Sequence, residues 1–434
     1  MTAEIAVYNR SGIALAADSA VTTTNGFSEK IYNNADKLFE LSKHHPVALM
    51  IYNNAGICGA PWELMIKAYR KSLGDKSFDF ISEYAADFFS FVQNNQNIVT
   101  VDMQGKYFFS LFSDAILPKL LKDVQDEDVA GFIKINNAAP SFDEYHDFIE
   151  QRCRRKFSEI YENPFFDSFT KEDFELAFSE LSPITYQLCA LRIQPNIDNP
   201  DNPYPESLKE ALALLLSSYM CKENDLQTYS GIVFAGYGDQ EFYPAIESHH
   251  IYGVYNGKIM KPSTKDKDNT GSSIGIFPFA QEDEVHTFMQ GCSQGIIKCV
   301  EDSVFGSLQK LKMEVTGLIS AQHPSISRYE IEAAFDATIA TTQGDTLEAI
   351  QNHMTLNHVQ KVLSVLGSLA KVDLGYMAES LVNLTAFKRK VSNDSDSVGG
   401  PIDVAVLSKG DGFVWMKRKH YFDKELNYQF FKRK

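Results

Sequence analysis

Both ends of the chain carry strand patterns, and this feature most constrains the fold. Short apolar strand patterns cover residues 3–9, 12–18, 401–407 and 413–417. Helical periodicity covers residues 76–225 and 283–390, and strand patterns return between these two stretches, at residues 230–279. Strands from both ends can share a sheet, so the sequence predicts an α+β protein with large helical insertions.

This order of patterns divides the chain into five predicted segments. Residues 1–75, 230–282 and 370–434 are expected to form the N-terminal, middle and C-terminal parts of one core. Residues 76–229 and 283–369 are expected to be helical insertions into that core.

Composition excludes several classes of function. The net charge of -16 and the pI near 5.1 argue against a nucleic-acid binder, which needs a basic face. No apolar run reaches the roughly 18 residues of a membrane span, so no membrane partner is expected. The six cysteines are scattered without metal-ligand spacing, and no signal peptide precedes them. We therefore expect a cytoplasmic protein with no metal and no cofactor.

The common catalytic motifs are missing from the sequence. It contains no HExxH, no P-loop, no GxSxG and no glycine-rich dinucleotide motif. The candidate catalytic residues that remain lie in and directly after the N-terminal hairpin.

Thr2 directly follows the initiator methionine and precedes the first strand. Because threonine is small, we expect Met1 to be removed, which would give Thr2 a free α-amine beside its own hydroxyl. Such an amine can act as the base for the hydroxyl nucleophile. The alternative is an ordinary N-terminal edge strand without chemistry.

Two charged residues complete the candidate catalytic set. Asp18 ends the second strand, so hairpin pairing brings it back toward Thr2. Lys37 begins the next predicted strand, and a buried lysine there would stabilise the alkoxide of Thr2, with Asp18 balancing its charge. Taken singly, each has a plain alternative, an aspartate at a strand end and an exposed lysine.

Residues 13–19, Ile-Ala-Leu-Ala-Ala-Asp-Ser, resemble the signature of proteasome β-subunits, which are N-terminal nucleophile (Ntn) hydrolases. The sixteen positions from Thr2 to Asp18 fit that signature once Met1 is removed. The lysine of the family falls on Lys37, about three positions later than usual, and Lys30 is the alternative.

Two further motifs support this resemblance, each with a departure. The turn at residues 52–56 resembles the oxyanion motif of the family, with Asn54 in place of its glycine, so a backbone N–H near Asn54 is expected to face the oxyanion. Residues 394–403 resemble an Asp-x-x-Ser-Gly-Gly element with the spacing shifted by one. Asp394 or Asp396, together with Ser397, are therefore the candidates for supporting the amine of the nucleophile.

The resemblance implies a bacterial proteasome-like homologue with long helical insertions. Its expected fold is a four-layer αββα sandwich of two antiparallel sheets. Its expected activity is that of a threonine peptidase, which cleaves peptide or protein substrates through an acyl-enzyme on Thr2 and assembles as a homo-oligomer. The sequence does not identify an unfoldase partner.

Two alternatives to this activity stay open. One is a non-peptidase Ntn amidohydrolase that acts on a small amide, and long insertions over the site would favour it. The other is a catalytically inactive assembly or scaffold subunit that keeps the fold, against which the intact set of Thr2, Asp18 and Lys37 argues.

Overall fold

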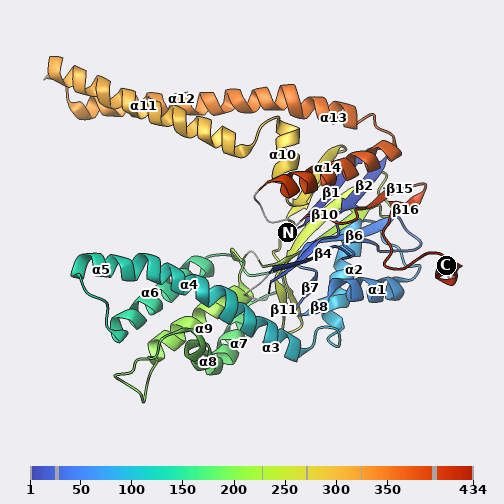
Figure 1. The fold of residues 1–434 in the computed structure, drawn as a ribbon, viewed down its shortest axis with the longest axis horizontal. Helices are drawn as coiled ribbons and strands as arrows, with labels where there is room; N and C mark the ends of the chain where they lie inside the picture. The colour runs from blue at the N-terminus through green and yellow to red at the C-terminus, as the bar shows by residue number, and fades with distance from the viewer. Residues whose placement is uncertain are drawn as a thin grey trace. The chain divides into compact units, whose positions relative to one another are not determined.

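The chain divides into two units in its computed structural model, which describes residues 2–24, 29–226, 228–269, 272–323, 325–392 and 398–432. The first unit combines Met1–Leu38 with Gly271–Lys434, and the second is Phe39–Thr270. Each unit contains an antiparallel sheet and packed helices (Figure 1), in agreement with the predicted α+β class.

The sheet of the first unit draws its strands from both ends of the chain. Its order is β14 (Gly275–Ala280), β1 (Ala3–Asn9), β2 (Gly12–Ala17), β15 (Asp403–Ser408) and β16 (Gly412–Lys417). β2 pairs directly with β15, with Ala14 opposite Val406. The strand patterns at the two ends of the sequence therefore meet as neighbours in one sheet.

Helices cover this sheet and bury its apolar side chains. α14 (Lys371–Val391) packs against β1 and β2, and α10 (Asp283–Gln290) and α13 (Gln360–Leu366) contribute further core residues. Ile5 and Val7 of β1 share this core with Leu374 and Leu381 of α14. All seven residues of β1 are buried, so the N-terminal strand is held firmly in place.

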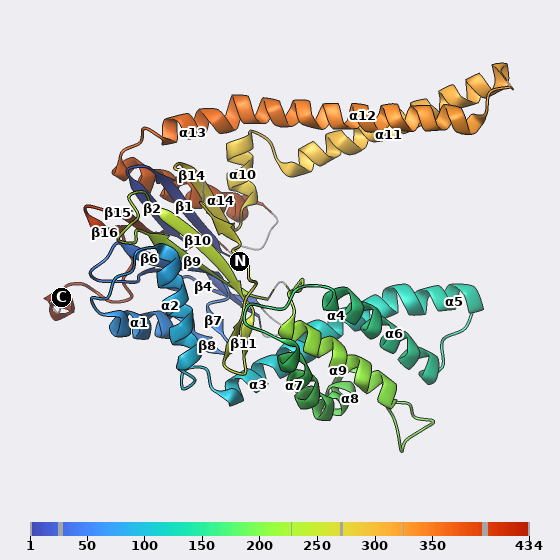
Figure 2. The ribbon, with the colours of Figure 1, turned by 180° about the vertical axis from the view of Figure 1, so that it is seen from behind.

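A long helical pair extends from the first unit. α11 (Gln294–Gln322) and α12 (Arg328–Met354) lie side by side along much of their length (Figures 1 and 2). Only a few of their described side chains are buried, among them Ile331 and Ile339. The pair continues through a π-helical turn (Thr355–Val359) into α13.

The sheet of the second unit has the order β13 (Lys267–Asp268), β10 (Ala245–Ile251), β9 (Ser230–Gly236), β6 (Val47–Asn53) and β5 (Leu38–Glu40). α1 (Trp62–Leu73) and α2 (Ile81–Asn94) share a core with it. Aromatic rings dominate that core, with Phe234 of β9 lying 5.6 Å from Phe88 of α2 between ring centroids.

Residues 101–221 of the second unit form a helical lobe. Its helices are α3 (Val101–Ser110), α4 (Leu117–Asp123), α5 (Ala130–Asn136), α6 (Phe142–Tyr161), α7 (Lys171–Leu181), α8 (Thr185–Arg192) and α9 (Glu206–Cys221), with π-helical segments at Leu111–Ile116 and Val124–Val129. The start of α6 follows from its sequence, because Ser141 and Glu144 form a capping box. α9 is apolar on most sides and packs against α6 and α7 in the lobe core.

The short strands were the hardest elements to predict. The strand expected to begin at Lys37 is confined to β5, and a hairpin of β3 (Val21–Thr24) and β4 (Glu29–Tyr32) was not predicted. The remaining short elements are β7 (Gly56–Ile57), β8 (Ala60–Pro61), β11 (Gly253–Tyr255), β12 (Lys258–Met260), a 3-10 turn (Ser182–Ile184) and α15 (Tyr428–Lys432). β3 and β4 form a separate sheet of two short strands, so their sequence shows no extended alternating pattern.

Membrane insertion finds no support in the helices. Among the described residues, no helix combines the length and the hydropathy that a crossing of the bilayer requires.

The turn between β1 and β2 is anchored by Asn9, which is fully buried. Its side-chain amide donates hydrogen bonds to the carbonyls of Leu366 and Leu369 at 2.8 and 2.9 Å, and its carbonyl accepts one from the Ser11 N–H at 2.8 Å. Asn9 therefore ties the N-terminal hairpin to the end of α13.

We predict that Asn9→Ala lowers the free energy of unfolding by about 1–3 kcal/mol, because it leaves buried backbone groups without partners. Urea denaturation followed by circular dichroism measures the loss. Asn383→Ala is the matched control, since the exposed Asn383 bonds only within its own helix, and it should change stability by less than about 0.5 kcal/mol. Equal effects of the two substitutions would contradict the anchoring role.

Candidate active site

The N-terminal hairpin places Thr2 and Asp18 next to each other. Thr2 immediately precedes β1, and Asp18 immediately follows β2. Glu4 lies opposite Ala17 in the register, and the Asp18 N–H donates to the Ala3 carbonyl at 3.2 Å. Thr2 and Asp18 are 3% and 1% exposed, so both polar side chains lie inside the protein.

The Asp18 carboxylate accepts four hydrogen bonds. Lys37 Nζ donates to it at 2.5 Å, and the N–H groups of Ala3, Ala20 and Gly399 donate at 3.2, 3.3 and 2.9 Å. Donors from four separate points of the chain thus converge on one buried carboxylate. Charge-assisted hydrogen bonds of this kind are the stronger ones in proteins.

Lys37 is buried and lies between two carboxylates. Its Nζ is 2.5 Å from Asp18 Oδ1 and 3.3 Å from Glu4 Oε1, and the side chain is 3% exposed. Lys37 precedes β5 instead of beginning a strand. The alternative, Lys30, is exposed in β4 opposite Thr23. The structure therefore places Lys37 against Asp18 and Glu4, whereas Lys30 is exposed.

The loop before Lys37 is fixed by its own contacts. The Ala35 N–H donates to the Ser19 carbonyl at 3.1 Å. Asp36 lies 3.3 Å from the Nζ of Lys419, which also pairs with the buried Asp403. These contacts hold the lysine in place without strand pairing.

Glu4 belongs to the site, although the sequence analysis did not select it. Its side chain is fully buried, and it lies two residues after Thr2, at the start of β1. Burial raises the pKa of Glu4 to about 8, the Lys37 charge lowers it, and the Asp18 charge raises it further. The signal was present in the sequence as one charged residue in an otherwise uncharged strand.

Two of these groups lack hydrogen-bond partners within the part of the chain that the structure describes. They are the hydroxyl of Thr2 and both carboxylate oxygens of Glu4, although Glu4 keeps its ion pair with Lys37. The Thr2 hydroxyl nevertheless lies close enough to Glu4 to lower the pKa of its carboxyl. Buried polar groups without partners are rare and often mark sites of chemistry.

The glycine element near the C-terminus also reaches the site. Gly399 donates to Asp18, and its carbonyl accepts from the Ser19 N–H at 3.1 Å. Ser19 Oγ donates to the Pro401 carbonyl at 2.5 Å. Gly400 has a φ of 76°, which favours glycine.

The other predicted members of this element, Asp394, Asp396 and Ser397, lie outside the described residues. Their proposed support of the Thr2 amine stays a prediction.

Asn54 lies in the second unit. It follows Asn53, whose φ of 60° marks the predicted turn, and its N–H donates to the Tyr229 carbonyl at 3.4 Å. Its expected role at the oxyanion stays a prediction.

Metal ligands are not gathered anywhere in the described ranges, where no three His, Cys, Asp or Glu residues could hold an ion together. Cys58, Cys153, Cys189 and Cys221 are buried free thiols, Cys292 is partly exposed and Cys299 is exposed.

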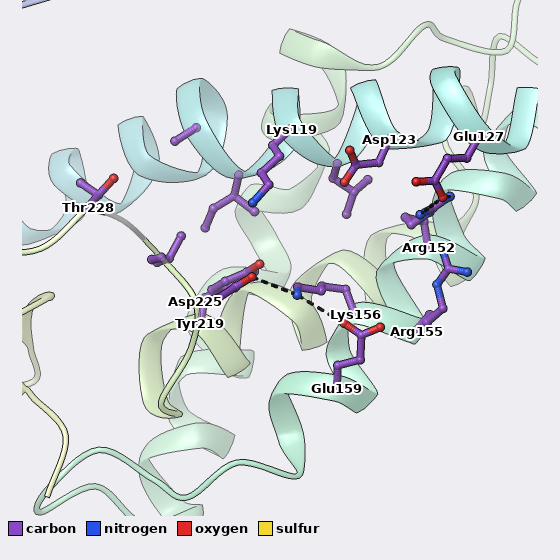
Figure 3. A pocket seen from close by; sticks show the side chains of 14 residues that line it. Lys119, Asp123, Glu127, Arg152, Arg155, Lys156, Glu159, Tyr219, Asp225 and Thr228 are labelled. Carbon is purple, nitrogen blue, oxygen red and sulfur yellow. Dashed lines mark hydrogen bonds and ion pairs between the residues drawn. The ribbon is translucent and has the colours of Figure 1, made fainter. Parts of the chain in front are cut away.

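A separate pocket of about 620 Å³ lies in the second unit, against the helical lobe (Figure 3). Four basic and four acidic side chains line it. The basic ones are Lys119, Arg152, Arg155 and Lys156, and the acidic ones are Asp123, Glu127, Glu159 and Asp225. Arg152 pairs with Glu127, and Lys156 pairs with Glu159 and Asp225. Because the charges balance, the pocket favours neither an anionic nor a cationic ligand.

Comparisons with known proteins return only distant structures. No protein-family model matches the chain, and no curated protein matches it. Anbu from Hyphomicrobium sp. strain MC1 is 10% identical with a TM-score of 0.29, covering 99% of this chain and 97% of that one. Anbu (ancestral beta-subunit) from Yersinia bercovieri is 9% identical with a TM-score of 0.26, covering 99% and 93%.

These comparisons correct the family assignment made from the sequence. The resemblance placed the chain among proteasome β-subunit-like Ntn hydrolases, as a bacterial homologue with long insertions. That assignment is wrong: no family model supports it, and the TM-scores of 0.29 and 0.26 to Anbu structures are too low to establish a common fold. Any function must therefore be argued from the site itself.

We predict that Lys37→Met lowers the free energy of unfolding by about 3–5 kcal/mol, because it leaves buried carboxylates without their counter-charge. Lys30→Met removes the same groups from an exposed position and should change stability by less than about 0.5 kcal/mol. Urea denaturation of the two variants at pH 7 measures both values. A stable Lys37→Met protein would show that Lys37 is not the buried counter-charge.

We predict that wild type loses stability relative to Glu4→Gln as the pH rises. The pKa of Glu4 rises from its ordinary value of 4.5 to about 8 in the folded chain, so the folded state keeps a proton that the unfolded chain releases. This stabilisation is present below pH 4.5 and is lost as the pH rises to about 8.

The expected loss is a few kcal/mol, at about 1.4 kcal/mol per pH unit. Urea midpoints of both proteins at pH 5, 7 and 9 measure it. A constant difference between the two proteins across this range would contradict the raised pKa.

Proposed function

We propose that the chain is an N-terminal threonine amide hydrolase with Thr2 as its nucleophile. The observation that carries the proposal is the buried Thr2 hydroxyl, which lies close to Glu4, the carboxylate 3.3 Å from Lys37 Nζ. A hydroxyl needs a base and a nearby positive charge to attack a carbonyl carbon, and this arrangement offers the charge.

Each residue has a defined role in the proposed reaction. Thr2 Oγ bonds to the carbonyl carbon of the substrate, and its proton passes to the Thr2 α-amine after Met1 has been removed. Met1 lies outside the described residues, and its removal is part of the proposal. The Lys37 ammonium stabilises the developing alkoxide of Thr2, and Asp18 fixes Lys37 through their 2.5 Å contact.

The reaction then closes in two steps. The amine returns the proton to the leaving nitrogen as the amide C–N bond breaks, which leaves an ester on Thr2. Water adds to this ester carbonyl, and the acid product leaves as Oγ regains its proton. Asp394 or Asp396 with Ser397 would support the amine.

Peptide bonds are the proposed substrate class. The proposal includes the fold and assembly expected from the sequence. These are an αββα sandwich, insertions at residues 76–229 and 283–369, and a homo-oligomer. The helices that cover one face of each sheet, α14 in the first unit and α2 in the second, are consistent with such layers.

We predict that a peptide β-lactone acylates wild type at Thr2 and leaves Thr2→Ala unmodified. Intact mass measures both the loss of Met1 and the added acyl group, and peptide mapping locates the acyl group. The exposed Thr341→Ala serves as the control and should be acylated like wild type. Equal acylation of wild type and Thr2→Ala would remove Thr2 from the reaction.

A further inference from the structure

Glu4 is the one group of the site that the proposed reaction leaves without a role. We propose that Glu4 is a second general base of this site, which takes the proton of the Thr2 hydroxyl whether or not Thr2 carries a free amine. This inference rests on the proposed function, because it concerns the same nucleophile and the same amide bond.

The position of Glu4 supports a direct role. Thr2 directly precedes the strand that carries Glu4, its hydroxyl lies close enough to lower the pKa of the Glu4 carboxyl, and the Glu4 side chain is fully buried. Asp18, by comparison, accepts four hydrogen bonds and has little capacity left to accept one from Thr2. Glu4 is therefore the carboxylate with room to accept the proton of Thr2.

The charges around Glu4 set its proton affinity. Lys37 and Asp18 are the charged groups that act on it, and the Thr2 hydroxyl is its other polar neighbour. Its partners across the strands, Ala17 of β2 and Phe279 of β14, carry no titratable group. Burial raises the pKa of Glu4 to about 8, close to the pH at which a general base is most effective.

The proposed steps balance in protons and bonds. Glu4 takes the hydroxyl proton as Thr2 Oγ bonds to the carbonyl carbon, and gives it to the leaving nitrogen as the C–N bond breaks. In the second half it takes a proton from water, whose oxygen bonds to the acyl carbon. It then returns this proton to Thr2 Oγ as the ester C–O bond breaks, so that Glu4 ends as it began.

Protein that keeps Met1 distinguishes the two proposed bases, because Thr2 then has no free α-amine and only Glu4 could act. Wild type and Glu4→Gln are each produced with and without a methionine aminopeptidase inhibitor, and intact mass confirms which proteins keep Met1. The rate of Thr2 acylation by a peptide β-lactone is then measured from pH 6 to 9. An α-amine titrates near pH 8 as well, so a pH profile alone would not distinguish it from Glu4.

We expect wild type that keeps Met1 to be acylated within about tenfold of the rate without Met1, and Glu4→Gln that keeps Met1 to react at least about 100-fold more slowly. The rate of wild type with Met1 should rise with pH toward about 8. Glu330→Gln, an exposed change in α12, should match wild type.

Three results distinguish failure of this inference from failure of the proposed function. Acylation of wild type only after Met1 removal would overturn the role of Glu4 and leave Thr2 as nucleophile. Unchanged rates in Glu4→Gln with Met1 would also overturn it. No acylation of any wild-type form at Thr2 would overturn the proposed function itself. The first comparison uses the native sequence, so it holds even if Glu4→Gln folds poorly.

Discussion

The Asp18 carboxylate is the contact on which the first unit depends. It receives hydrogen bonds from the start of β1, from the segment after β2, from Lys37 and from Gly399, near the C-terminal strands. A buried carboxylate is stable only when its charge is compensated, so these four points of the chain are constrained together. The same constraint holds the Lys37 ammonium 3.3 Å from Glu4, the neighbour of the Thr2 hydroxyl.

Burial is the main cause of the raised pKa of Glu4, and the charge of Asp18 raises it further. Lys37 is the counter-charge of both Asp18 and Glu4, and Asp18 lies closer to it. A second buried negative charge would be uncompensated, which favours the protonated form of Glu4 below about pH 8. Near pH 8 Glu4 can therefore both release and accept a proton, next to the Lys37–Asp18 ion pair.

Secondary structure was most predictable where patterns were long or strongly apolar. The strand patterns of β1 and β2 predicted their elements to within a residue, because hairpin pairing depends on neighbouring residues. The hairpin of β3 and β4 and the short β5 were missed or misjudged, since strands of three or four residues carry too little periodicity. The family assignment failed because it rested on short motifs, and such motifs can match a family by chance in a chain of another fold.

The sequence by itself determined that Thr2 and Asp18 meet, because hairpin register is a local property and brings Asp18 back to the start of β1. It also placed strands at both ends. Only the tertiary structure decided that Lys37 and not Lys30 is buried beside Asp18, that Gly399 donates to Asp18 from 381 positions away, and that Glu4 is sealed from water. Burial and long-range contact arise from packing of distant segments, which local periodicity does not encode.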